Sequence, residues 1–413
     1  MSLHLIIVGA GQAAAQAIQT LRHEGFDGAI TLLGSESHLP YQRPPLSKKY
    51  LAGELPRERL ALRPESFYRD KHVSLELGTA VERLEPTASR IVLSGGRCLG
   101  YDRLLLATGS RVRPLQVPGA DLEGVHYLRT MDDVDAIAAE FAPGRRLVLV
   151  GAGYIGLEVA AVAKRCGLDV TVLEAAERVM GRVVSPPVSE IYQRYHTNAG
   201  VDIHCRAAVA AFKGRKRVEA VETSNGTRHP CDFAIVGVGI VPNVELAAAA
   251  GLPCDDGILV DEYARTADPN IFAAGDCTNH PHPLLGYRVR LESVQNAIEQ
   301  AKAAAASLMG ASRPYDTVPW FWSDQYQLKL QIAGLSRGYD EIAIRGIPEE
   351  HSFSAFYLRR GCLIAVDSIN SPRDFMFGKK LIAARFGTSA AVLMDPGTDL
   401  AALAKGVEQA AEG

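Results

Sequence analysis

The sequence lacks most features that mark membrane, metal or disulfide proteins. No apolar run approaches the roughly 18 residues that span a bilayer, so no transmembrane segment is expected. The seven cysteines are odd in number and scattered, without a Cys-x-x-Cys pair, which favours small, buried, reduced thiols over disulfides or metal ligands. His280 and His282 have no acidic or cysteine companions at ligand spacing, so no metal site is expected.

Neither positive nor negative residues are in large excess. The chain has 44 Lys and Arg against 47 Asp and Glu, a net charge of −3, and it has no basic tail. This balance argues against a nucleic-acid partner. The sequence enters an apolar strand within a few residues of Met1, so no targeting leader is expected and the protein is predicted to be cytoplasmic.

Two glycine-rich turns are the most informative features that are present. They are Gly9-Ala10-Gly11 and Gly151-Ala152-Gly153, and each follows an apolar run and opens a helix-like stretch. In such a turn the first Gly permits the tight bend and the second lets the backbone approach a pyrophosphate. The third position, Ala14 or Gly156, packs helix on strand. One copy is a weak signal, but two copies predict two dinucleotides, a flavin and a nicotinamide.

An acidic residue after the second strand of such a unit is expected to bind the adenosine ribose. In the second unit this residue is Glu174, whose charge repels a 2′-phosphate and therefore favours NADH over NADPH. Arg178 and Arg182 follow closely, so use of NADPH stays open. In the first unit both Ser35 and Glu36 follow the strand, and we favour Glu36.

The hydrophobic periodicity predicts an α/β fold with two Rossmann-like dinucleotide-binding domains and a C-terminal α+β domain. The first domain is expected to be discontinuous, over 1–109 and 237–315, with the second over 110–236 and the third over 316–413. The expected strands include 3–8, 29–33, 147–150, 169–173 and 233–239, with further short strands around 340–346, 353–358 and 362–367. The expected helices are 12–24, 154–166, 292–309 and one from about 398.

Six motifs together resemble one family. They are Arg43-Pro-Pro-Leu-Ser-Lys48, Ala107-Thr-Gly109, Gly151-Ala-Gly-Tyr-Ile-Gly-Leu-Glu158, Gly275-Asp-Cys277, Glu292-Ser-Val-Gln-Asn-Ala297 and Pro319-Trp-Phe-Trp-Ser-Asp-Gln-Tyr326. In this order they resemble the NADH-dependent ferredoxin reductases of the FAD-containing glutathione-reductase superfamily, over nearly the whole chain. The departures are Ala14 at the third glycine position and Ser35 where relatives often carry Asp.

The resemblance implies FAD on the first domain, NADH on the second and a C-terminal domain that helps to form the partner surface. The implied FAD contacts are Gly9, Gly11, Ala13, Ala14, Glu36, Arg43, Lys48, Val81, Arg129, Asp276, Val294 and Trp320. The predicted NAD contacts are Gly151, Gly153, Tyr154, Ile155, Gly156, Glu158, Glu174 and Gly239. From the residues alone, Val81 and Arg129 would have stayed unassigned.

Lys48 and Glu158 are the predicted catalytic pair. We expect the Lys48 ammonium near flavin N5, where it favours the reduced anion, with Glu158 holding it in place. The N-terminus of the helix after Glu292 is expected to face the flavin N1/C2=O edge, with the Val294 N–H as donor. Where disulfide reductases of the superfamily carry a Cys pair, residues 41–48 contain no sulfur, so electrons are expected to leave directly from the flavin. Cys277 is expected to be a packing residue.

The predicted activity is hydride transfer from NADH to FAD, followed by delivery of single electrons to a [2Fe-2S] ferredoxin. That ferredoxin would serve a Rieske dioxygenase or a cytochrome P450. Arg63, Lys302 and Lys329 are candidates for a basic docking patch, and Trp320 and Trp322 have the spacing that puts both indoles on one face of a strand. The alternatives are a rubredoxin reductase and an NADH-sensing flavoprotein resembling apoptosis-inducing factor. A monomer or weak homodimer is expected.

Overall fold

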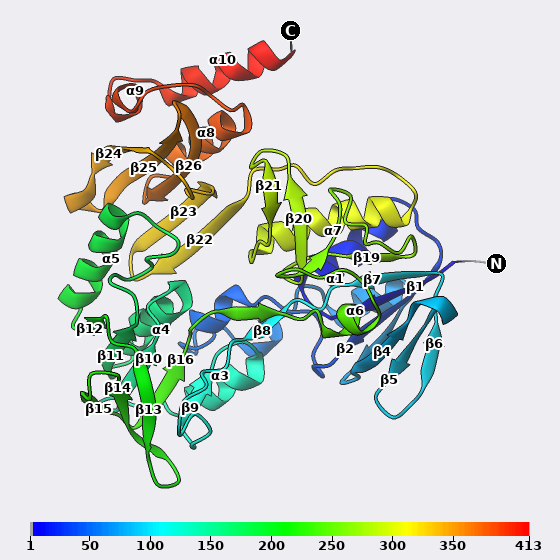
Figure 1. The fold of residues 1–413 in the computed structure, drawn as a ribbon, viewed down its shortest axis with the longest axis horizontal. Helices are drawn as coiled ribbons and strands as arrows, with labels where there is room; N and C mark the ends of the chain where they lie inside the picture. Colours follow the sequence, from blue (N-terminus) through cyan, green and yellow to red (C-terminus); the bar gives the residue numbers. More distant parts are fainter. Residues whose placement is uncertain (1–2, 413) are drawn as a thin grey trace. The chain divides into compact units, whose positions relative to one another are not determined.

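The computed structural model describes residues 3–412, which divide into two compact units (Figure 1). The first unit contains the chain up to Gln42 together with Arg57–Arg111 and Val241–Pro319. The second contains Arg43–Pro56, Val112–Ile240 and the chain from Trp320 onward. The short strands β8 (Ser110–Val112) and β17 (Ile240–Pro242) lie where the chain passes from one unit to the other.

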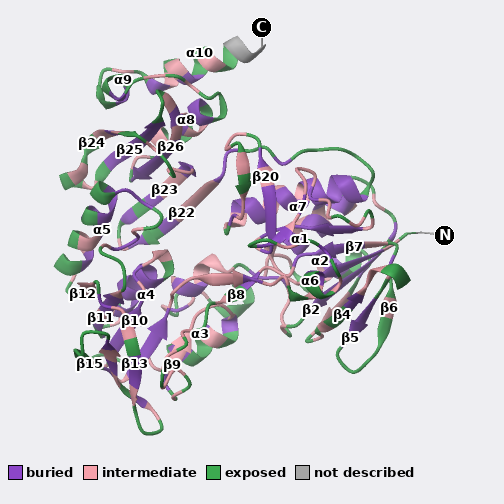
Figure 2. Cartoon of the chain, in the orientation of Figure 1, coloured by how far each residue is buried: buried purple, intermediate pink, exposed green. Residues whose placement is uncertain are grey.

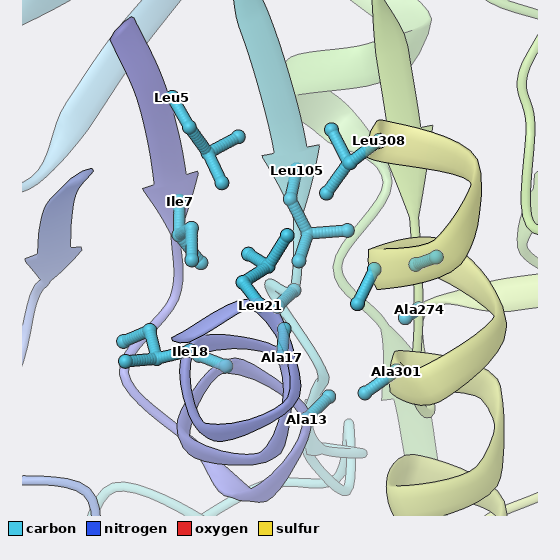
Figure 3. Packing of buried hydrophobic residues seen from close by; sticks show 14 of the residues in the cluster. Leu5, Ile7, Ala13, Ala17, Ile18, Leu21, Leu105, Ala274, Ala301 and Leu308 are labelled. Carbon is cyan, nitrogen blue, oxygen red and sulfur yellow. The ribbon is translucent and has the colours of Figure 1, made fainter. Parts of the chain in front are cut away.

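A five-stranded parallel sheet forms the centre of the first unit. Its order is β19-β7-β1-β2-β3, with β1 His4–Val8, β2 Ala29–Gly34, β3 Val73–Leu77, β7 Arg103–Leu106 and β19 Ile271–Ala273. The central strands are almost continuously apolar because a parallel sheet of this kind is buried on both faces. Helices α1 (Gln12–His23) and α7 (Val294–Leu308) pack beside each other on the sheet. In Figure 3, Ala13 of α1 faces Ala301 of α7, and such small side chains let the two helices approach closely.

Smaller elements complete the first unit. An antiparallel sheet contains β4 Val81–Glu85, β5 Arg90–Leu93 and β6 Cys98–Gly100. A second small sheet contains β18 Ile258–Leu259, β20 Thr278–His282 and β21 Tyr287–Val289, and the short helices are α2 Glu65–Asp70 and α6 Glu245–Ala249. A second apolar cluster joins residues of β1, β4, β5, β7 and β19 to the segment 244–260.

The second unit repeats the parallel-sheet plan. The strand order is β12-β11-β10-β16-β9, with β9 Val125–Tyr127, β10 Arg146–Val150, β11 Asp169–Glu174, β12 Asp202–Cys205 and β16 Phe233–Val236. The helices are α3 Met131–Ala138, α4 Tyr154–Arg165 and α5 Pro186–Asn198. A three-stranded antiparallel sheet adds β13 Val209–Gly214, β14 Val218–Thr223 and β15 Arg228–Pro230.

The C-terminal part of the second unit is an antiparallel sheet with helices after it. Its order is β22-β23-β26-β25-β24, with β22 Trp320–Gln325, β23 Leu328–Gly334, β24 Glu341–Ile347, β25 Ser352–Arg359 and β26 Cys362–Ile369. The following helices are α8 Pro372–Ala383, α9 Ala390–Met394 and α10 Leu400–Glu412. Strands β25 and β26 are largely buried (Figure 2). The 3-10 helices of the chain are η1 Pro44–Ser47, η2 Arg57–Arg59, η3 Pro86–Ala88 and η4 Pro348–Glu350.

The expected fold class is confirmed, and the main predicted elements are present. The sequence did not predict the sheets β4–β6 and β13–β15 as such, because each consists of short, partly exposed strands. Among the described residues all seven cysteines are free. Their burial was predicted less well, since only Cys231 and Cys277 are buried, Cys98 is exposed and the others are half-buried.

Candidate functional site

Both glycine-rich turns have a backbone that only glycine adopts without strain. Gly9 has φ of +107° and Gly151 has φ of +101°. A Cβ on Gly9 would lie 2.1 Å from the Ala107 carbonyl oxygen, and one on Gly151 would lie 2.5 Å from the Gly237 carbonyl oxygen. Each turn therefore passes against the strand next to it, in a place where a side chain does not fit.

The second glycine of each turn opens onto free space at a helix N-terminus. A Cβ built on Gly11 or Gly153 would meet no atom of the described chain within 4 Å. These residues are the N-caps of α1 and α4, and among described residues neither helix has a side-chain cap or an acidic residue in its first turn. By contrast, Thr130 caps α3 in a complete capping box. The first N–H groups of α1 and α4 thus stay available to an anion such as a pyrophosphate, so both turns fit a dinucleotide.

The third position of the two turns differs in how much room it leaves. A Cβ on Gly156 would lie 2.1 Å from the Gly151 carbonyl oxygen, so the second turn requires glycine there. The first turn accommodates Ala14, which is completely buried, and Ala13 also packs in the apolar core. The departure from the usual glycine at position 14 therefore leaves the first turn intact.

The predicted ribose-binding carboxylates lie at the ends of the second strands. Glu174 accepts hydrogen bonds from the backbone N–H groups of Ala152 (2.7 Å) and Ala176 (2.8 Å), which holds its carboxylate beside the second glycine turn. Glu36 accepts a hydrogen bond from the Tyr41 hydroxyl at 2.6 Å. Arg178 donates to backbone carbonyls of its own loop, at Gly181 and Val184. A Cβ on Gly239, the last predicted NAD contact, would lie 3.6 Å from the Arg182 guanidinium.

The predicted ion pair between Lys48 and Glu158 is formed. Lys48 Nζ lies 2.6 Å from Glu158 Oε2, and only 3% of the Glu158 side chain is exposed. Two serines that the sequence analysis did not single out complete the coordination of this carboxylate. Ser47 Oγ donates to Oε2 at 2.5 Å and Ser323 Oγ donates to Oε1 at 2.6 Å. Both serines lie within motifs that carry the family resemblance, which was the only available signal.

Two predicted FAD residues of the second unit also meet. Arg43 Nη1 donates to the backbone carbonyl of Arg129 at 2.7 Å. The Arg129 N–H in turn donates to Asp133 in the first turn of α3. Segments that are far apart in the sequence are therefore tied together beside η1. The role of both arginines at FAD stays a prediction.

The other predicted FAD residues lie as follows. Asp276 accepts a hydrogen bond from the Ser110 hydroxyl at 2.8 Å. The preceding Gly275 N–H donates to Gln300 of α7, another buried residue that the sequence analysis did not identify. Val294 begins α7, whose N-cap is Ser293. Val81 begins β4 and packs against the second apolar cluster.

Trp320 belongs to an aromatic cluster on β22. Its ring centroid lies 5.6 Å from that of Trp322, which confirms that the two indoles share a face. Lys379 Nζ lies 5.6 Å from the Trp320 ring centroid, and Phe375 meets the same ring edge-on. Tyr154 and Ile155 begin α4; Tyr154 stacks obliquely on Phe321 at 4.8 Å, while Ile155 is 44% exposed beside the second glycine turn.

The three candidate docking residues differ in whether neighbouring side chains bind or compensate their positive charge. Lys302 is paired with Glu299 at 2.8 Å, one turn earlier in α7. Arg63 donates to the Gln19 side-chain oxygen and lies over the Phe67 ring. Lys329 is exposed at the beginning of β23. The charge of Lys302 is therefore partly compensated.

A pyridine nucleotide-disulphide oxidoreductase family model matches residues 3–301. The chain belongs to this family. A reductase C-terminal model matches residues 320–404. Residues 3–412 contain no helix that is both long and apolar enough to cross a membrane.

Known relatives match the chain over nearly its full length. Rhodocoxin reductase of Rhodococcus erythropolis is 47% identical over 92% of this chain and 90% of its own. A ferredoxin–NAD(P)(+) reductase of Sphingomonas sp is 43% identical over 95% of this chain and 94% of its own. Among solved structures, the covalent putidaredoxin reductase–putidaredoxin complex matches with a TM-score of 0.95 and 42% identity. That match spans 100% of this chain and 99% of the other.

Proposed function

We propose that this oxidoreductase is an FAD-dependent NADH:ferredoxin reductase that serves an oxygenase system through a [2Fe-2S] ferredoxin. The observation that carries the proposal is the presence of two glycine turns that each open an uncapped helix, in a chain whose relatives include a ferredoxin–NAD(P)(+) reductase. The solved reductase–putidaredoxin complex supports a small electron-carrier protein as the partner.

The residues present fit both dinucleotides. Gly9, Gly11 and the α1 N-terminus would hold the FAD pyrophosphate, with Glu36 at the ribose and Asp276 at the ribityl chain. Gly151, Gly153 and Glu174 would hold NADH in the same way. When bound, FAD supplies the conversion of a two-electron hydride donor into single-electron delivery.

The Lys48–Glu158 pair supplies the electrostatics of this site. Lys48 brings a positive charge that favours a reduced, anionic flavin, and the buried carboxylate fixes the position of its ammonium group. A thiol relay is not part of the proposal. Cys277 is fully buried, and burial raises the pKa of its thiol, so it is kept protonated and inert.

We place the protein in the cytoplasm as a monomer or weak homodimer, and propose Lys329, Lys302 and Arg63 as parts of the docking surface. The free cysteines of the described chain fit a reducing compartment. NADH is the proposed donor, because the Glu174 carboxylate lies beside the second turn and repels a 2′-phosphate.

A panel assay tests the partner class. NADH-dependent reduction of cytochrome c is measured with [2Fe-2S] ferredoxins, with a rubredoxin and without a carrier. We expect at least one ferredoxin to support turnover well above the carrier-free rate. Turnover with rubredoxin alone would favour a rubredoxin reductase. Slow NADH oxidation with every carrier and with ferricyanide would favour an NADH-sensing flavoprotein instead.

A further inference from the structure

A chain of buried polar side chains continues from Glu158 away from Lys48. Ser323 Oγ donates to Glu158 Oε1 at 2.6 Å, and Gln325 Nε2 lies 3.2 Å from Ser323 Oγ as its donor. Gln325 Oε1 is 2.9 Å from His196 Nε2. Ser323, Gln325 and His196 are all completely buried. The chain therefore links α4, β22 and α5 of the second unit by side-chain hydrogen bonds alone.

All hydrogen bonds of this chain point in one direction. The Gln325 amide oxygen can only accept, so His196 Nε2 must carry the proton and donate. Gln325 then donates to Ser323, which donates to the carboxylate. Burial lowers the pKa of His196 to about 4, so the imidazole is neutral near pH 7 and donates from one nitrogen. Its Nδ1 has no hydrogen-bond partner within the described part of the chain.

These hydrogen bonds fix the orientation of the Glu158 carboxylate. Lys48 and Ser47 both bind Oε2, and Ser323 binds the opposite oxygen. With donors on both oxygens the carboxylate plane cannot rotate without losing a charge-assisted hydrogen bond in a buried place, where such a loss is costly. Ser323 cannot fix the direction of its own hydroxyl group. That direction is fixed by the hydrogen bond from Gln325, which is itself held by His196.

We propose that Ser323, Gln325 and His196 are positioning residues that orient the Glu158 carboxylate toward Lys48. This inference rests on the proposed function, in which the Lys48–Glu158 pair acts at the flavin. The three residues do not act on substrate themselves. They keep the carboxylate aligned, and through it they keep the Lys48 ammonium in place during hydride transfer.

Several other titratable groups surround Glu158. Tyr154 lies on the same helix and Tyr192 on α5, and burial raises the pKa of both phenols, so neither ionises near pH 7. Asp367 of β26 acts electrostatically on both tyrosines, and burial raises its pKa to about 7. Asp367 is therefore expected to contribute a titration of its own to the pH profile near neutral pH. The difference between the wild-type and variant profiles, rather than one profile alone, therefore reports on the hydrogen bonds from His196 through Gln325 to Ser323.

The experiment compares Ser323→Ala with wild type in two measurements on the FAD-loaded enzyme. The first is the pH dependence of flavin reduction by NADH in anaerobic stopped flow. The second is a pH titration of the visible flavin spectrum without NADH. Loss of one donor leaves the carboxylate, and with it the Lys48 ammonium, less firmly oriented. We expect the plateau rate of flavin reduction to fall about tenfold and the spectral titration to differ from that of wild type.

Further variants separate positioning from simple stability. Ser323→Thr, which keeps the hydroxyl, should restore both readouts. Gln325→Met and His196→Leu should have successively smaller effects, and His196→Gln, which keeps a donor, should be milder than His196→Leu. Ser354→Ala is the matched control, because Ser354 is a buried serine of the same sheet whose hydroxyl binds Ser368 instead.

A double-mutant cycle provides the decisive comparison. If Ser323 acts through Glu158, then Ser323→Ala should add little in a Glu158→Gln background. An equal loss in both backgrounds, or superimposable spectral titrations of wild type and Ser323→Ala, would overturn the proposal. An enzyme that accepts electrons from NADH but reduces no ferredoxin would refute the proposed function without affecting either comparison. If NADH does not reduce the flavin, the spectral titration still tests the positioning role.

Discussion

Lys48 and the buried Glu158 form an ion pair, with 2.6 Å between Nζ and Oε2, although 110 residues separate them in the sequence. The lysine follows the proline-rich helix η1, and the glutamate lies in the first half of α4, directly after the second glycine turn. An ammonium held by one buried carboxylate is a fixed charge rather than a mobile surface cation. Its expected role is to favour the reduced flavin.

Removing this fixed charge should change the redox potential. In Lys48→Met the stem remains and the ammonium is lost, so the midpoint potential of the bound flavin should fall and hydride transfer should slow. Each kcal/mol of lost stabilisation corresponds to about 20 mV for a two-electron couple. The midpoint potential is measured against reference dyes. Lys49→Met, at an exposed neighbouring position, is the control; an unchanged potential in Lys48→Met would show that the ammonium is not near the flavin.

Coenzyme choice should depend on Glu174. The wild type should prefer NADH by about one to two decades in kcat/KM, the equivalent of one charge-assisted hydrogen bond. Glu174→Gln should reduce this preference mainly by improving the use of NADPH. Glu177→Gln removes a largely exposed charge from the same loop and should leave the preference unchanged. Equal kcat/KM for the two coenzymes in the wild type would mean that Glu174 does not select between them.

The second glycine turn should be the NADH site. In Gly156→Ala the new Cβ would lie 2.1 Å from the Gly151 carbonyl oxygen, so the start of α4 must shift. We expect NADH binding to weaken by about tenfold, ~1.4 kcal/mol, while the FAD content stays normal. Gly406→Ala, in open space on α10, is the control. Loss of FAD with normal NADH binding would reverse the assignment of the two turns.

Docking of the partner should depend on local positive charge. Lys329→Glu and Lys302→Glu should slow ferredoxin-dependent cytochrome c reduction, most clearly at low ionic strength, because charges at the rim of an interface act mainly on association. Lys329 should have the larger effect, since Glu299 already compensates Lys302. Lys405→Glu changes the net charge equally on α10 and is the control. Ferricyanide reduction should be unaffected; a parallel loss there would indicate damage to the flavin site.

The sequence predicted the parallel sheets and their glycine turns well, because buried strands and tight turns leave local patterns. It also predicted the Lys48–Glu158 pair, from a lysine that follows a Pro-Pro turn and a glutamate on the helix after the second glycine turn. It did not predict Ser47, Ser323 or Gln300, since a serine or glutamine has no distinctive spacing and its role depends on what the fold brings beside it. The hydrogen-bonded side chains from Ser323 to His196 join the edge strand β22 to helix α5, which is far away in the sequence. No local sequence pattern predicts such a contact.

We expect electrons to pass from NADH to the carrier through the flavin without a redox-active thiol. An anaerobic titration with NADH tests this expectation most directly, followed by mixing with an oxidised ferredoxin that supports turnover. We predict that one NADH fully reduces the enzyme per FAD, that two one-electron ferredoxins are then reduced, and that prior alkylation of accessible cysteines changes neither number. Uptake of two NADH per FAD, or loss of electron delivery after alkylation, would show that a thiol takes part in electron transfer.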